Sequence, residues 1–255
     1  MTTAQRRIEI YDLLKEQITV EVSELAKMFS VSTMTIRRDL AMFEKQGLVT
    51  TNYGGAYLNV GTTVEPSFSL KSGQSMQDKK AMGRAAAELV RDGESIILDC
   101  GTTTMQIMPY VLQKKITIIT GSWGVVQYFQ GNVKAELILA PGRYSQTSAG
   151  AMSETTADFF RTFHVDKAFL GVDGVDIQRG ATVPDSMDAH VKRSILSSGK
   201  QCILMATGGK FGQSYLMEFS PLSGFSHIIT DRDPGEEYQK QLRAKGISLL
   251  VSGEE

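Results

Sequence analysis

The 255-residue sequence has few cysteines, few histidines and no long apolar run. Its two cysteines, Cys100 and Cys202, are far apart and form no CxxC pair, which is typical of a reduced, cytoplasmic protein. Its histidines, His164, His190 and His227, lack metal-ligand spacing, so no metal centre is predicted. No stretch of about 18 apolar residues occurs, and the N-terminus lacks the apolar centre of a signal peptide. We therefore expect neither a membrane-spanning helix nor a secretory leader.

The sequence also lacks a strong charge of either sign. Its 27 Lys and Arg residues against 28 Asp and Glu residues give a formal net charge of −1. Any nucleic-acid-binding surface must therefore be local. The hydrophobic content of 42% and the charged content of 22% are ordinary for a globular protein. The length is enough for two domains, each with its own core.

The first part of the chain reads as three short helices and a hairpin. No glycine precedes Gly47, and residues 4–16 and 19–29 place apolar side chains at helical spacing. Ser32 is a suitable N-cap for a third helix, which Gly47 can close. Residues 48–58 then read as two short strands around a Gly-Gly turn. This order predicts a winged helix-turn-helix.

The rest of the chain predicts an α/β domain with a mostly parallel sheet. Helical stretches alternate with seven continuous apolar runs, as expected for strands that are buried on both faces. These runs are 95–98, 116–120, 135–140, 166–174, 201–207, 226–230 and 247–251. We expect a DNA-binding domain over 1–57, a linker rich in Gly, Ser and Thr over 58–76, and a second domain over 77–255.

The third helix has a face suited to reading DNA. Ile36, Leu40 and Phe43 form one stripe at about 100° per residue, which we assign to the core. The opposite side offers hydroxyls, arginines and a methionine, which suit phosphates, guanine edges and thymine methyl groups. An isolated Arg-Arg pair is more often merely solvated, but this pair lies on the second helix of a helix-turn-helix and is followed by a wing. The predicted DNA contacts are Ser32, Thr33, Met34, Thr35, Arg37, Arg38, Tyr53 and Gly54.

Polar residues follow the predicted strands of the second domain. The loop 101–104, GTTT, offers a tight turn, hydroxyls and the start of a helix, which suit a phosphate, although many such turns bind nothing. Because the carboxyl ends of parallel strands share one edge of a sheet, other strand-end residues should lie nearby. Together they suit a small sugar phosphate. They are Gly121, Arg143, Asp173 and Lys210, with Lys192 on a following helix.

In both of its predicted domains the sequence resembles the DeoR family of bacterial transcription regulators. The N-terminal part has TIRRDL at 35–40 and GGA at 54–56, and the remainder has EPSF, GTTT, DKAFLGVDGV, VKR and KFG. The resemblance implies a winged helix-turn-helix and an effector domain that resembles ribose-5-phosphate isomerase in fold and senses a phosphorylated sugar. Carried over by motif, the ligand residues are Asp99, Gly101, Thr102, Thr103, Thr104, Asp173, Lys192 and Lys210.

The sequence departs from the family pattern in its wing and at the sheet edge. Tyr53 and Thr51 stand where the family usually has a histidine and often has an arginine. Gly121 replaces an asparagine, Pro141 stands in place of a glycine, and residues 207–209 read TGG where the family tends to have Asp-Ser-Ser. The wing should therefore bind DNA differently. For the second domain two alternatives stay open: a ligand that is larger than usual, or a site that is partly degenerate.

Three functions are consistent with this sequence. The first is a repressor that senses a phosphorylated sugar, the second a phosphosugar isomerase, and the third a DNA-binding protein whose second domain only oligomerises. Isomerases of this fold carry an acidic run that ends in glutamate, where this chain has Ile177, so we favour sensing over catalysis. The expected partners are operator DNA, a phosphorylated sugar and further copies of the chain in a homodimer or homotetramer. No cofactor is expected.

Overall fold

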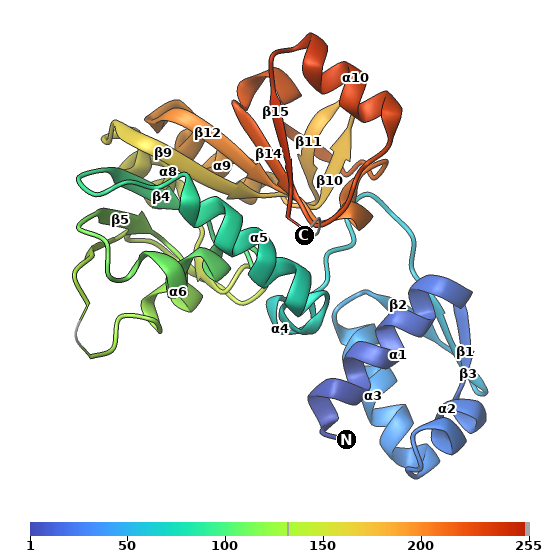
Figure 1. Ribbon diagram of the computed structural model, residues 1–255. Coiled ribbons are helices and arrows are strands. Elements are labelled where there is room, and N and C mark those ends of the chain that lie inside the picture. Colours follow the sequence, from blue (N-terminus) through green and yellow to red (C-terminus); the bar gives the residue numbers. More distant parts are fainter. Residues whose placement is uncertain (132, 253–255) are drawn as a thin grey trace. The chain divides into compact units, whose positions relative to one another are not determined.

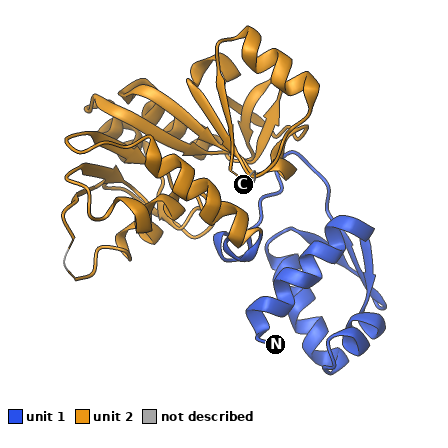
Figure 2. Ribbon diagram, in the orientation of Figure 1, with its two compact units in different colours: residues 1–74 blue, residues 75–255 orange. Residues whose placement is uncertain are grey.

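The computed structural model describes residues 1–131 and 133–252. The chain divides into two compact units, residues 1–74 and residues 75–255 (Figure 2). In the described residues, no helix is both long enough and apolar enough to cross a membrane.

The first unit is a winged helix-turn-helix, as predicted. Ser32 accepts a hydrogen bond from the amide of Thr35 and caps the third helix, and Gly47 follows that helix with φ +70°. Ile36, Leu40 and Phe43 are buried in the core of the unit. The elements are α1 (Thr3–Gln17), β1 (Thr19–Glu21), α2 (Val22–Met28), α3 (Thr33–Lys45), β2 (Val49–Thr51) and β3 (Gly55–Leu58), with antiparallel strand order β1-β3-β2.

The expected linker over 58–76 contains a helix that belongs to the first unit. This helix, α4 (Phe68–Gly73), packs on α1 and buries Leu70. A Cβ on Gly73 would lie 1.9 Å from Cδ1 of Ile8, so a larger residue there would require the Ile8 side chain to move. The unit therefore extends to residue 74. Six residues are too few to show a helical period in the sequence.

The second unit is built on a seven-stranded sheet in which every pair of neighbours is parallel (Figure 1). Each of the seven predicted apolar runs forms one of its strands. In sheet order they are β15 (Ser248–Val251), β14 (His227–Thr230), β12 (Gly199–Met205), β9 (Val165–Gly171), β4 (Ser95–Leu98), β5 (Thr117–Thr120) and β6 (Glu136–Leu139).

Helices cover both faces of this sheet, which explains the continuous apolar runs. In β4, Ile96 and Leu98 pack in one core with α5 (Met76–Glu88) and α6 (Met108–Val111). Ile97 points to the other face and packs in a second core with α8 (Glu154–Arg161) and α9 (Ser186–Ser198). Successive side chains of a strand point to opposite faces, so each core takes alternate residues.

The structure adds short antiparallel strands that the sequence did not reveal. Strands of two to four residues are too short for a clear alternation, and β13 lies far along the chain from its partner. They are β10 (Gly174–Asp176), β11 (Gly180–Val183) and β13 (Met217–Ser220) in one sheet, and β7 (Tyr144–Ser145) with β8 (Gly150–Ala151) in another. The remaining helices include α7 (Trp123–Val126) and α10 (Glu236–Ala244).

Candidate functional site

The outer face of α3 presents several of the predicted DNA contacts. Thr33, Met34 and Arg38 are exposed, and Met34 keeps 58% of its surface accessible. Arg38 has no side-chain partner within the described part of the chain. The hydroxyls of Ser32 and Thr35 lie 3.0 Å apart and share the helix cap, so they are already partly occupied.

Asp39 anchors α3 to α1 and was not singled out from the sequence. Its Oδ2 accepts from Nε of Arg6, and its Oδ1 accepts from Nε of Arg7, both at 2.7 Å. Asp39 is 1% exposed, so its charge depends on these two guanidinium groups. The sequence did offer a signal for this contact, since Asp39 is a charged residue beside the apolar stripe of α3. A carboxylate that is buried there needs cationic partners.

The wing is tied to α3 at two points. A terminal nitrogen of Arg37 donates to the carbonyl oxygen of Tyr53 at 2.9 Å, and the guanidinium lies 5.7 Å from the centre of the Tyr53 ring. Glu44 accepts from the amide and the hydroxyl of Thr51, which lowers the pKa of the Glu44 carboxyl. Arg37 is therefore held against the wing, whereas Arg38 has no such contact among the described residues. At the tip, the side chain of Asn52 accepts from the amide of Gly54.

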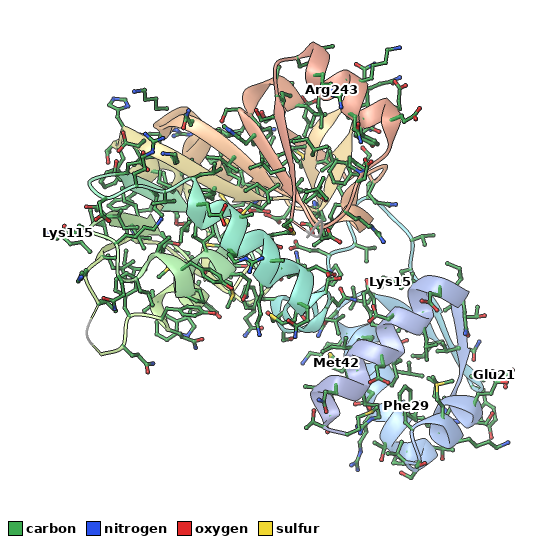
Figure 3. All side chains as sticks on the ribbon, viewed as in Figure 1. Lys15, Glu21, Phe29, Met42, Lys115 and Arg243 are labelled. Atoms are coloured by element: carbon green, nitrogen blue, oxygen red, sulfur yellow. The ribbon has the colours of Figure 1, made fainter. Side chains whose placement is uncertain are left out.

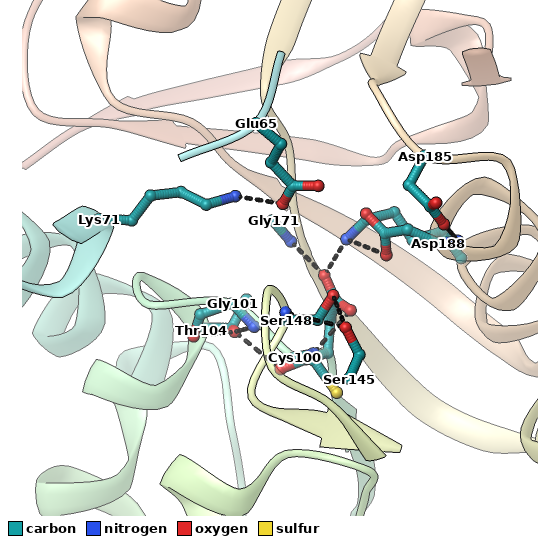
Figure 4. Close-up of polar contacts among 12 residues, drawn as sticks. Glu65, Lys71, Cys100, Gly101, Thr104, Ser145, Ser148, Gly171, Asp185 and Asp188 are labelled. Atoms are coloured by element: carbon teal, nitrogen blue, oxygen red, sulfur yellow. Dashed lines mark hydrogen bonds and ion pairs between the residues drawn. The ribbon is translucent and has the colours of Figure 1, made fainter. Parts of the chain in front are cut away.

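A buried ion cluster lies where β4 ends in the second unit (Figure 4). Oδ2 of Asp99 accepts from the ammonium of Lys192 and from the amide of Gly171, the latter at 3.0 Å. Asp188, one turn before Lys192 on α9, brings a second carboxylate to 3.6 Å from the same ammonium. Burial opposes the charge of Lys192, but the carboxylates of Asp188 and Asp99 outweigh it and raise its pKa. Asp188 was missed, although its spacing of four residues from Lys192 was visible in the sequence.

The GTTT loop is a tight turn locked by its own last hydroxyl. Thr104 donates to the carbonyl oxygens of Asp99 and Gly101, at 3.0 Å each, and accepts from the amide of Gly101 (Figure 4). Thr104 is fully buried, so its hydroxyl is occupied by the turn. The backbone amides of Thr102 and Thr103 donate to no acceptor in the described ranges. These two amides, rather than the Thr104 hydroxyl, are available to an anion.

The helix after this loop is weaker than the sequence suggested. A single continuous helix was expected, but a 3₁₀ turn over Thr104–Ile107 precedes the one-turn helix α6. Pro109 lies in the first turn of α6 and has no amide hydrogen to offer. The dipole of this short helix would therefore contribute little to the binding of an anion at the loop.

A second ion pair lies at the neighbouring strand ends. Nζ of Lys210, after β12, lies 3.1 Å from Oδ1 of Asp173, after β9. Because β4, β9 and β12 are consecutive in the sheet, this pair lies at the same edge as Asp99. Asp176 is not part of this edge cluster, since it accepts from the amides of Gln178 and Arg179 in the turn between β10 and β11.

Two further residues, the predicted Arg143 and the neighbouring Cys100, are not part of these ion pairs. Arg143 follows the edge strand β6, is exposed and makes no side-chain contact with the cluster in the residues that the structure covers. Cys100 is next to Asp99, and burial together with that carboxylate raises the pKa of its thiol well above the ordinary value. Cys100 is therefore not a reactive thiolate.

The DeoR-like helix-turn-helix domain matches residues 6–62, and the DeoR C terminal sensor domain matches residues 74–232. The chain belongs to the DeoR family. The predicted family is thereby confirmed, and this chain is a DNA-binding transcription regulator of that family.

This DeoR-family chain has relatives that match along nearly their whole length. It is 32% identical to the "Putative aga operon transcriptional repressor" of Escherichia coli O157:H7, over 99% of this chain and 95% of that protein. It is 29% identical to the "Glycerol-3-phosphate regulon repressor" of Escherichia coli (strain K12), over 98% and 99%. Among solved structures, ribose 5-phosphate isomerase A of Methanocaldococcus jannaschii matches 54% of this chain and 55% of that one at 15% identity, with a TM-score of 0.39.

The structure gives physical reasons for two departures from the DeoR pattern. A Cβ on Gly121 would lie 3.3 Å from the carbonyl oxygen of Ala151, because β8 packs against this position. A Cβ on Gly208 would lie 2.2 Å from Nε of Arg232, a flexible side chain that would have to move. Larger side chains at either position would displace these neighbours.

Proposed function

We propose that this chain represses a sugar-utilisation operon in the cytoplasm and that a phosphorylated sugar, bound by the second unit, alters its affinity for the operator. The polar cluster at the ends of β4, β9 and β12 carries this proposal. It places free backbone amides in the GTTT loop and a partly accessible ammonium, that of Lys210, on one sheet edge. A related repressor is named for glycerol 3-phosphate, a small phosphorylated polyol, which supports the ligand class.

Within this site we assign separate roles to the two ion pairs. Strand ends two positions apart in a sheet are separated by about 10 Å, so the loop amides and Lys210 can bind different parts of one ligand. The amides of Thr102 and Thr103 bind the phosphate, and Lys210 with Asp173 binds sugar hydroxyls. Lys192 is only 5% exposed and is neutralised by Asp99 and Asp188, so it holds the edge together.

Binding should require the phosphate group. Trp123, the only tryptophan, begins α7 just beyond the end of β5 and is 53% exposed, so its fluorescence can report a ligand at this edge. We expect members of a panel of pentose, hexose and triose phosphates to change this fluorescence, and their unphosphorylated forms to leave it unchanged. Lys210→Met should weaken binding about 10-fold or more, because a charged hydrogen bond is lost.

Lys240→Met serves as the matched control, since Lys240 is an exposed lysine on α10. Equal binding of sugars with and without phosphate would contradict the phosphate assignment. Conversion of any panel member to another sugar phosphate would favour the isomerase function instead. If no panel member bound, a second unit that only assembles subunits would become the better interpretation.

Arg38 should carry much of the DNA affinity. We expect Arg38→Ala to weaken binding to a duplex selected by the wild-type protein from a random pool by about 5- to 150-fold, with a salt dependence shallower by about one ion. Fluorescence anisotropy over a salt series measures both quantities. Arg243→Ala, on α10 in the second unit (Figure 3), removes the same charge far along the chain and should change neither. An unchanged affinity of the Arg38→Ala variant would refute the assignment of this face.

We further expect a homodimer or homotetramer, because paired half-sites on DNA require two helices α3 at a fixed spacing. A ligand that binds one arrangement of the subunits more tightly would shift the population toward or away from the DNA-binding arrangement.

A further inference from the structure

The wing of this chain carries no cation of its own. Residues 49–58 read VTTNYGGAYL and contain no lysine, arginine or histidine. Attraction to DNA phosphates comes chiefly from lysine and arginine, so this wing needs a cation from elsewhere in order to bind the backbone electrostatically.

Arg37 brings a cation to the tip of the wing. Its guanidinium donates to the carbonyl oxygen of Tyr53 at 2.9 Å and lies 5.7 Å from the centre of the Tyr53 ring. An arginine has five N–H donors, and the carbonyl oxygen of Tyr53 accepts one of them, so others remain for a phosphate. The side chain of Tyr53 is held by this contact and yet 94% of the residue is exposed, the largest fraction among the exposed large apolar residues.

The wing and α3 therefore form one connected surface. Besides the contact of Arg37, Glu44 holds the amide and hydroxyl of Thr51 at 3.0 and 2.6 Å, two turns further along the helix. Arg38, in contrast, is exposed and unpaired among the residues that the structure describes. Neighbouring arginines thus have different environments, one fixed against the wing and one free to reach into a groove.

We infer that Arg37 and Tyr53 act as a single unit that grips the DNA sugar-phosphate backbone whatever the base sequence, and that base discrimination by this Arg-Arg pair falls to Arg38. The guanidinium bridges the Tyr53 carbonyl and a phosphate, and the Tyr53 ring rests against the adjacent sugar. The inference rests on the proposed DNA contacts of α3, and it assigns to Arg37 a specific role as a positioning residue that also binds phosphate.

The test compares two duplexes of equal length, one selected from a random pool by the wild-type protein and one with its sequence scrambled. The full-length variants Arg37→Ala, Tyr53→Ala and the double variant are titrated with both by anisotropy. Arg37→Ala should weaken binding to both duplexes by a similar factor, about 5- to 30-fold, and leave their affinity ratio unchanged. Tyr53→Ala should also weaken both equally. The double variant should lie within about 2-fold of the weaker single variant, because its members act together.

Arg37→Lys keeps the charge but lacks the planar fork, so it should preserve the salt dependence and recover only part of the affinity. A change in the affinity ratio on Arg37→Ala would overturn the inference, since a base reader alters discrimination. The inference would also be overturned if the losses of affinity caused by Arg37→Ala and Tyr53→Ala multiplied in the double variant, or if neither variant weakened binding. If Arg38→Ala left the affinity for both duplexes unchanged while Arg37→Ala weakened both, the role proposed for Arg38 would be contradicted. The role inferred for Arg37 and Tyr53 would still be supported.

Discussion

Replacing Asp39 by alanine is expected to destabilise the N-terminal unit by about 3–5 kcal/mol. The carboxylate forms ion pairs with both Arg6 and Arg7 and is itself 1% exposed. Its loss leaves the buried guanidinium of Arg6 without a counter-ion, which costs more than the attraction of the pair contributes. Because Asp39 lies on α3 and its partners lie on α1, the loss should loosen the helix that reads DNA.

Amide hydrogen exchange of residues 33–45 in the full-length protein measures this effect. The Asp39→Ala variant should exchange much faster in α3 and bind DNA more weakly, and Asp39→Asn should recover little, because an amide carries no charge. Asp158→Ala is the matched control: its ion pair with Arg161 on α8 is exposed, so its removal should cost at most about 1 kcal/mol. Unaltered protection of α3 in Asp39→Ala would show that the anchor is dispensable.

Replacing Lys192 by methionine should destabilise the second unit by a similar amount, about 3–5 kcal/mol. The ammonium is shared by Asp99 and Asp188, and the change removes the cation that both buried carboxylates contact. Methionine fills a similar volume, so the effect measures charge rather than a cavity. Denaturant unfolding followed by Trp123 fluorescence, which reports this unit alone, gives the free energy of unfolding.

The double variant Lys192→Met with Asp99→Asn measures the interaction energy between Lys192 and Asp99 separately from the contributions of their other neighbours. Removing both charges should be less harmful than removing the lysine alone, with a coupling of about 1–3 kcal/mol. Strictly additive losses would mean that Lys192 and Asp99 do not stabilise each other. If the double variant folds, its response to phosphosugars tests whether the pair only holds the edge, as proposed, or also binds the ligand.

Much of the fold followed from local patterns. Apolar runs between helical stretches predicted all seven strands of the main sheet, because strands of a sheet covered by helices on both faces are mostly apolar. Ser32 and Gly47 marked the ends of α3 by capping chemistry that acts over a few residues. Helix α4 and the small sheet of β10, β11 and β13 were not predicted, since each is too short to show a period and is stabilised by distant contacts.

The candidate sites were predicted by residue type but not by role. The alternation of strands and helices predicted a parallel sheet, so that residues after its strands share one edge, and the structure places Asp99, Asp173 and Lys210 there. The sequence did not predict that Thr104 is consumed by its own turn or that Arg143 lies apart. Those facts depend on hydrogen bonds and packing that form only when the loops are folded.

The sequence by itself determined which elements form, which faces they bury and to which family the chain belongs, because these depend on periodicity, capping and short motifs. Only the tertiary structure decided which charges meet. Asp39 pairs with Arg6 across 33 residues, and Asp99 pairs with Lys192 across 93. Such partners are selected by burial, since a charge removed from water must find an opposite charge wherever the fold brings one.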